Sequence, residues 1–180
     1  MTEKVSAKIY VASLADYNAG HLHGRWLEAG QHASGVRAEI AEMLAESKEP
    51  MAEEWAIHDF EGFGGVRLSE YEDIETVCEL AELISHHGEI FAALCANFGG
   101  TDDIEYARKV MENGYNGAHE SLADYAQELV EDCYSDALNG LPDFIKYNID
   151  WKGIGSDFEL NGDIFTVEHD GKVHVFDSNV

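Results

Sequence analysis

The sequence predicts an α+β protein of three small lobes, with short antiparallel strands in the first and last lobes and an acidic, mainly helical middle. Segments rich in β-branched and aromatic residues lie near both ends, while the middle has the apolar periodicity of helices. Glycine-containing stretches at 62–65 and 98–101 are the expected boundaries of lobes 1–62, 63–101 and 102–180, although they could equally be turns within one domain. With 180 residues, 45% of them hydrophobic, the chain can build a packed core.

In the first lobe, two predicted strands flank one helix. Residues 8–14 and 54–60 alternate well enough to form strands. The helix is expected over 35–47, from the spacing of Val36, Ile40 and Met43, and Pro50 ends it. The first strand is expected to lead into a loop that contains Asn18, Gly20 and Gly24.

The middle of the chain is predicted to be helical over 72–91. Val77, Leu80, Ile84 and Phe91 form its apolar stripe, and Gly88 divides it into two shorter helices. A further helix is expected after residue 100, with Thr101 or Asp102 as its N-cap.

The last lobe combines helices with a hairpin. We expect helices over 120–138, 143–150 and 151–160, followed by strands at 163–168 and 172–176 that the turn at 169–171 joins. The inner face of the first of these helices is predicted to consist of Leu122, Tyr125, Leu129, Cys133 and Ala137.

The charge of the chain restricts its partners. There are 36 acidic residues against 11 Lys and Arg, a net charge of −25. Residues 68–145 hold 18 of the acids with only Arg108 and Lys109, so self-repulsion there has no local salt-bridge relief. This charge argues against binding to nucleic acid or to an anionic membrane, whose phosphates would repel it, and it favours a cation or a basic partner.

Acidic residues recur at helical spacing on the faces opposite the apolar stripes. Asp124, Glu128, Asp132 and Asp136 repeat every four residues, about 6 Å of helix, although like charges at this spacing destabilise a helix. A few such stripes side by side approach the charge density of duplex DNA. At that density, 25 charges correspond to about 42 Å of duplex, or ~12 base pairs, and a two-fold dimer would correspond to ~25 base pairs. The candidate phosphate-mimicking acids are Glu70, Glu72, Asp73, Glu75, Glu79, Glu82, Glu89, Asp102, Asp103, Glu105, Asp124, Glu128, Glu131, Asp132 and Asp136.

Other interpretations of these residues stay open. The acids could form a solvated face with no specific role, or a carboxylate pair could serve a hydrolase. Residues 157–168 resemble a calcium-binding EF-hand loop, but 164–167 is strand-like, and Asn161-Gly162 suits a helix C-cap. The pairs His21/His23 and His86/His87 could bind metal, although no zinc-finger spacing accompanies them.

Several classes receive no support. Cys78, Cys95 and Cys133 are expected to be small core residues in a reducing cytoplasm, and the first residues have no signal-peptide pattern. No apolar run reaches the 18 residues of a membrane helix, and no nucleotide or hydrolase fingerprint is present. We therefore predict a cytoplasmic protein that is not an enzyme and needs no cofactor or metal.

Several segments are familiar together. Residues 9–29 (IYVASLADYNAGHLHGRWLEA) and 54–63 (EWAIHDFEGF) resemble the ArdA family of antirestriction proteins, as do 120–129, 147–151 and 157–162. The resemblance spans about residues 8–168. We expect Tyr17, His23 and Trp26 of the first segment to serve packing more than partner contact.

The resemblance implies an elongated homodimer of three-lobed chains from a mobile element. Such a protein mimics DNA, occupies the DNA-binding groove of type I restriction-modification enzymes and inhibits them. The acidic middle would then present carboxylates to the Lys and Arg of that groove. The alternative is an acidic module that antagonises other basic DNA-binding host proteins, such as nucleoid proteins.

Overall fold

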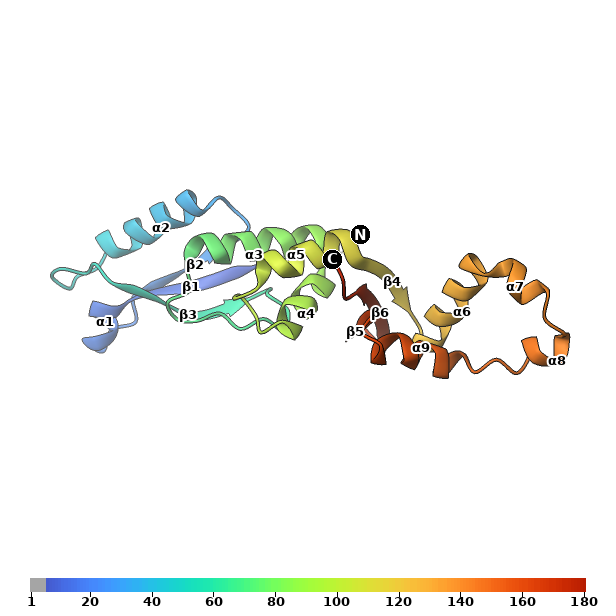
Figure 1. Ribbon diagram of the computed structural model, residues 1–180. Helices are drawn as coiled ribbons and strands as arrows, with labels where there is room; N and C mark the ends of the chain where they lie inside the picture. Colours follow the sequence, from blue (N-terminus) through green and yellow to red (C-terminus); the bar gives the residue numbers. More distant parts are fainter. Residues whose placement is uncertain (1–5) are drawn as a thin grey trace. The chain divides into compact units, whose positions relative to one another are not determined.

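The computed structural model describes residues 6–180 and contains two compact units, Met1–Ile104 and Glu105–Val180. Each unit has a three-stranded antiparallel sheet, and helices occupy the chain between the sheets, so the predicted α+β class is confirmed (Figure 1). The boundaries of the three predicted lobes stay a prediction. No helix among residues 6–180 combines the length and apolarity that a membrane crossing requires.

The first sheet has the order β2-β1-β3, with β1 (Lys8–Ser13) in the centre. β1 and β3 (Trp55–Glu61) are the predicted strands 8–14 and 54–60, each within one residue. A bulge shifts their register between the pairs Tyr10↔Asp59 and Val11↔Ile57. The central strand is buried, with Ile9 and Val11 both fully excluded from solvent.

The loop predicted to contain Asn18, Gly20 and Gly24 is present over residues 19–23, but Asn18 belongs to α1 (Leu14–Asn18) and Gly24 to β2 (Gly24–Glu28), neither of which was predicted. The Ser13 side chain caps α1 by accepting from the Asp16 backbone N–H. Gly24 opens β2 because a Cβ there would lie 2.5 Å from the carbonyl oxygen of Val11. The glycine therefore permits a close strand approach, where its sequence signal suggests a turn.

Three helices complete the first unit. α2 (Ala33–Ala45) begins after the N-cap His32 and ends well before Pro50, so the predicted span 35–47 is shifted by two residues. It packs against β1, β2 and α3. α3 (Ile74–His87) and α4 (Glu89–Asn97) occupy the span predicted over 72–91, and Gly88, with a φ of +83°, separates them as expected. The second helix was predicted too short, because α4 continues past residue 91 to Asn97.

In the second unit the sheet order is β4-β6-β5. β5 (Ile164–His169) and β6 (Lys172–Asp177) form the predicted hairpin, and Asp170 and Gly171 have the positive φ angles of a type I′ turn. β4 (Tyr115–His119) was not predicted, because its register with β6 is irregular and Gly117 has a φ of +96°. A strand of this kind lacks the alternation by which strands are recognised.

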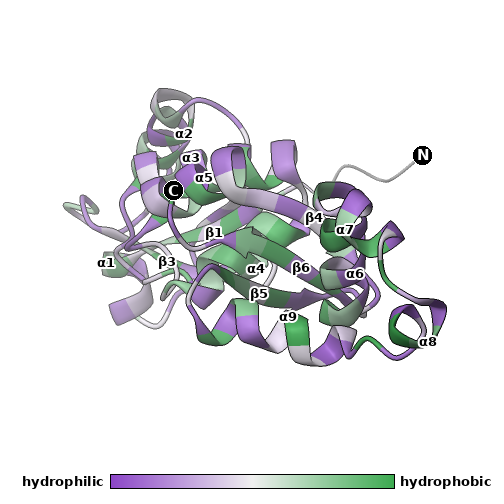
Figure 2. Ribbon diagram, turned by 45° about the vertical axis from the view of Figure 1, so that its right-hand side comes forward, coloured by the Kyte–Doolittle hydropathy of each residue, from purple (hydrophilic) through white to green (hydrophobic). Residues whose placement is uncertain are grey.

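The helix predicted over 120–138 consists of two helices. α6 (Leu122–Cys133) and α7 (Ser135–Asn139) meet at Tyr134, whose φ of −129° is not helical. Tyr125 is buried against Ile164 and Val175, with Leu122 and Leu129 packed beside them, but Cys133 and Ala137 are exposed. Figure 2 shows hydrophobic residues, in green, along β5 and β6. The predicted inner face is therefore correct in its first half and wrong at Cys133 and Ala137, where the chain has left the core.

The remaining helices are α5 (Ile104–Gly114), α8 (Asp143–Lys146) and α9 (Trp151–Leu160). α9 matches its predicted span, whereas α8 is a single turn where 143–150 was expected. α5 begins later than predicted, so neither Thr101 nor Asp102 directly precedes it; the Thr101 hydroxyl donates instead to a carboxylate oxygen of Glu72, at 3.1 Å.

Candidate functional site

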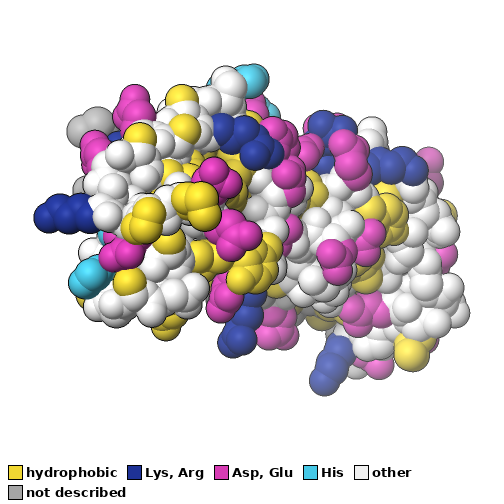
Figure 3. Space-filling model, turned by 90° about the vertical axis from the view of Figure 1, so that its left-hand side faces the viewer, with side chains coloured by type: hydrophobic (Ala, Val, Ile, Leu, Met, Phe, Trp, Pro, Cys, Tyr) yellow, Lys and Arg dark blue, Asp and Glu magenta, His cyan; other side chains and the backbone are white. Residues whose placement is uncertain are grey.

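The predicted mimic acids lie on helices and on the loops that precede them. Nine belong to the first unit, on α3, α4 and their flanking loops, and six to the second, on α5, α6 and α7. Thirteen of the fifteen are exposed, and Glu72 and Glu79 are half-buried. Figure 3 shows one face of the molecule, over which Asp and Glu side chains are spread among uncharged atoms and fewer Lys and Arg.

Some of these acids also stabilise the local backbone. Asp73 caps α3 by accepting from the Thr76 backbone N–H at 3.3 Å. Glu72 accepts from the Ser69 N–H at 3.2 Å. Asp124 donates its backbone N–H to the hydroxyl of Ser121, the N-cap of α6. These carboxylates near helix N-termini are favoured by the helix dipole, so their presence needs no partner to explain it.

Arg37 of α2 neutralises acidic residues at the start of α3, although it lies far from them in the sequence. Its guanidinium donates to Glu75 from Nε at 3.0 Å and reaches Asp73 at 3.4 Å. These hydrogen bonds lower the pKa of Glu75 to about 2. The expectation of no salt-bridge relief in this stretch is therefore wrong at α3, because folding brings a base from 38 residues earlier in the chain.

The other acids differ in how far they are neutralised. Glu105 pairs with Arg108 at 2.7 Å, and Glu128 lies 3.2 Å from the ring of His119. Glu131 accepts from Gln127. Within residues 6–180, the predicted acids whose side chains have neither an ion pair nor a hydrogen bond are Glu70, Glu79, Glu82, Asp102, Asp103, Asp132 and Asp136.

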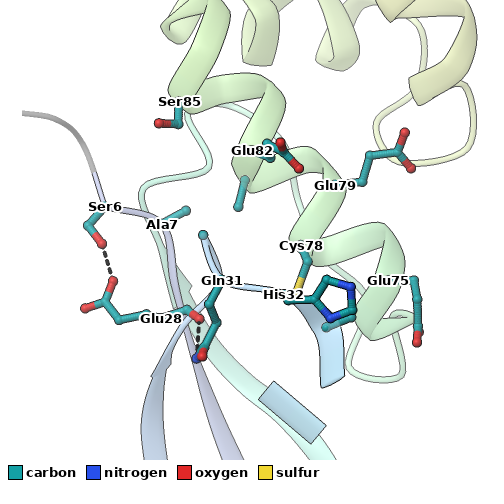
Figure 4. A pocket seen from close by; sticks show the side chains of 13 residues that line it. Ser6, Ala7, Glu28, Gln31, His32, Glu75, Cys78, Glu79, Glu82 and Ser85 are labelled. Atoms are coloured by element: carbon teal, nitrogen blue, oxygen red, sulfur yellow. Dashed lines mark hydrogen bonds between the residues drawn. The ribbon is translucent and has the colours of Figure 1, made fainter. Parts of the chain in front are cut away.

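A groove of about 780 Å³ runs beside α3 in the first unit. Glu75, Glu79 and Glu82 line it from α3, and Glu28 lines it from the end of β2. In Figure 4 these carboxylates spread around the groove and do not converge on one point, which suits several separate basic groups better than one ion. Glu28 was not among the predicted acids, because it lies far from α3 in the sequence. Only the folded chain brings the end of β2 to the groove that Glu75, Glu79 and Glu82 line.

The other sequence motifs have structural roles. The EF-hand-like segment is not a loop, since α9 contains Asp157 and β5 contains Glu168, with Asn161 as the C-cap between them. Tyr17 contacts the ring of His58 at 4.9 Å, and Trp26 that of Tyr10 at 5.6 Å, although both aromatic side chains stay partly exposed.

The structure also bears on the cysteines and on the alternative of a carboxylate hydrolase. Cys78 and Cys95 are buried as expected, and burial raises the pKa of Cys95 to about 12, whereas Cys133 is exposed. Hydrogen bonding lowers the pKa of Asp16, Glu28 and Glu75, which is opposite to the raised value that a general-acid carboxyl needs.

The comparison with protein families decides the assignment. A model of antirestriction proteins (ArdA) matches residues 9–172, which is most of the chain. The chain belongs to the ArdA family. Membership implies an antirestriction function, exerted by an inhibitor protein on restriction enzymes. A search of curated proteins found no match.

Proposed function

We propose that this ArdA protein mimics double-stranded DNA and occupies the DNA-binding groove of type I restriction-modification enzymes. The observation that carries the proposal is the set of exposed carboxylates on α3 and on α6 and α7 that no described Lys or Arg neutralises. Glu82, Asp132 and Asp136 are examples. A fold gains nothing from such uncompensated repulsion, so a basic partner gives the better account of it.

The spacing on α6 suits a row of phosphates. Asp124, Glu128 and Asp132 are all exposed and follow one another at four-residue steps, about 6 Å apart along one helix face. Carboxylates accept charge-assisted hydrogen bonds from Arg and Lys much as phosphate oxygens do. Association driven by this surface is expected to be fast and to weaken steeply with salt.

The test is competition for a type I enzyme that holds labelled duplex DNA, measured at low and high salt. The informative variant neutralises four acids that have no structural partner: Glu79→Gln, Glu82→Gln, Asp132→Asn and Asp136→Asn. A control variant neutralises four exposed acids outside the predicted set: Glu53→Gln, Glu54→Gln, Asp163→Asn and Glu168→Gln. Both variants carry the same net charge, so only the position of the lost charges differs.

We expect the wild type to displace the DNA, with displacement much weaker in high salt. The first variant should need at least tenfold more protein, and the control should behave like the wild type. Equal loss in both variants would mean that net charge alone acts. Failure of the folded wild type to displace DNA would reject the type I groove as the target and favour the nucleoid-protein alternative.

We also infer that two copies associate through an apolar surface formed by α8 and the residue that follows it. Phe144 and Tyr147 are 72% and 84% exposed there, and Ile145 is 40% exposed. A chain of this charge can dimerise only where few carboxylates meet, and large exposed apolar patches mark such interfaces. Lys146 lies in the same segment as Asp143, and its Nζ donates to the Asn139 carbonyl at 3.3 Å.

Sedimentation equilibrium checks this interface. Phe144→Asp together with Tyr147→Asp should convert the dimer to a monomer without loss of helix content. Leu160→Asp is the control, because Leu160 is 84% exposed but lies at the end of α9. A wild type that is monomeric throughout, or a double variant that stays dimeric, would contradict the assignment.

A further inference from the structure

Three potential metal ligands meet in the first unit, away from the acidic helices. They are Asp16 of α1, His21 in the turn that follows, and Glu49 in the loop between α2 and β3. One ligand atom from each lies within 4.8 Å of the others, and His21 Nδ1 is 3.2 Å from a carboxylate oxygen of Glu49.

Hydrogen bonds hold the three ligand-bearing segments in place. The Ser47 hydroxyl donates to Asp16 Oδ2 at 2.5 Å and accepts from the Glu49 backbone N–H at 3.0 Å. The backbone N–H of His21 donates to the carbonyl of Asp16 at 2.9 Å. Because a neutral hydroxyl orients the Asp16 carboxylate, the arrangement has the outer-shell support that metal ligands usually have.

Asp16 is the buried member of the set. Its side chain is only 3% exposed, and it has no ion pair with a Lys or Arg in the part of the chain that the structure describes. A buried carboxylate is stable when it is both hydrogen-bonded and paired with a cation, and the Ser47 hydroxyl supplies the hydrogen bond but no charge. His21 and Glu49 remain accessible from solvent, so a cation could enter from that side.

We propose that Asp16, His21 and Glu49 bind a divalent transition-metal ion of the zinc type. An imidazole nitrogen with two carboxylate oxygens is a donor set that zinc accepts, with water as the fourth ligand, whereas calcium and magnesium prefer oxygen ligands alone. His23 is not among the residues whose ligand atoms meet there, and its Nε2 lies 2.6 Å from the carbonyl oxygen of Met43. The ion would join the turn after α1 to the loop before β3.

The experiment is equilibrium binding of Zn²⁺ to the metal-stripped full chain, in high salt to suppress diffuse association with the acidic surface. Co²⁺ serves as a second probe, since its visible absorption reports nitrogen and oxygen ligation. The ligand variants are His21→Ala and Glu49→Gln, and Ser47→Ala tests the supporting hydroxyl. His86→Ala is the control, because His86 is an exposed histidine outside the proposed site, where its ring contacts that of His87.

We expect one tightly bound ion per chain and a rise in the thermal midpoint when Zn²⁺ is added. His21→Ala and Glu49→Gln should each weaken binding by more than about 100-fold, and Ser47→Ala by about 10- to 100-fold. His86→Ala should bind as the wild type does. Absence of a tight ion, unchanged affinity in His21→Ala, or loss of the ion in His86→Ala would each overturn the proposal.

Discussion

His174 is a buried residue whose protonation links folding stability to pH. It is 7% exposed, its ring stacks on Tyr115, and its Nδ1 lies 2.7 Å from the Tyr115 hydroxyl. Burial lowers its pKa below the usual 6.5. The folded chain therefore holds fewer protons on this group than the unfolded chain does, and stability must fall as the pH drops below about 6.5.

We predict a loss of at most about 1.4 kcal/mol per pH unit from this one proton between pH 6.5 and the folded-state pKa. Denaturant unfolding of the second unit at several pH values measures it. His174→Gln should flatten the dependence, while the exposed His86→Gln should leave it intact. An unchanged slope in His174→Gln would assign the effect to another group.

Arg37 determines how one predicted mimic charge titrates. The ion pair keeps the pKa of Glu75 at about 2, so its stabilising effect is complete above the unfolded value of about 4.5 and is lost as the pH falls towards 2. Arg37→Met should raise the pKa of Glu75 towards its usual value, as measured by NMR titration of the carboxyl carbon. Arg108→Met should leave that pKa unchanged, because Arg108 pairs with Glu105. A low pKa that persists in Arg37→Met would contradict the assigned cause.

At the scale of elements, the contact between α6 and α9 depends on a glycine. A Cβ at Gly155 would lie 2.8 Å from the Leu122 carbonyl oxygen and 2.9 Å from its Cγ. This explains why a residue that weakens the helix prediction occurs inside α9: the two helices approach too closely for a side chain.

Gly155→Ala should therefore destabilise the second unit by about 1–3 kcal/mol, although alanine is the better helix former. Urea unfolding followed by circular dichroism measures this change. Gly140→Ala is the matched control, because a Cβ there would meet its nearest atom at an ordinary 3.5 Å. That change should be neutral or slightly stabilising, and equal destabilisation in both variants would refute the packing explanation.

For the whole molecule, the same acidic residues affect both stability and the proposed function. The carboxylates proposed to bind the restriction enzyme repel one another in the free protein, so salt should stabilise the fold. We expect the thermal midpoint to rise between about 0.01 M NaCl, where the screening length is ~30 Å, and about 1 M, where it is ~3 Å.

The variant that neutralises Glu79, Glu82, Asp132 and Asp136 should have a higher midpoint at low salt and a smaller rise with salt. The control variant should change less, since its acids lie in regions where Lys and Arg are more frequent. Equal shifts in the two would show that net charge acts without regard to position. A lower midpoint would show that these carboxylates stabilise the fold.

Much of this protein follows from local sequence patterns. The central strand, the hairpin of β5 and β6, the break at Gly88 and the span of α9 were all predictable, because alternation, turn chemistry and helical periodicity act between near neighbours. Exposure of most of the acidic candidates was also predictable, since charged groups with no nearby base rarely enter a core. The family resemblance, too, is contained in the sequence.

Tertiary structure decided what depends on residues far apart in the chain. It placed Arg37 beside Glu75, added Glu28 to the groove along α3, and turned Cys133 away from the core that Tyr125 enters. It also gathered Asp16, His21 and Glu49 from three segments. The sequence alone determined which charges the molecule carries, and the fold determined which of them are neutralised, because an ion pair depends on distance in space and not on separation along the chain.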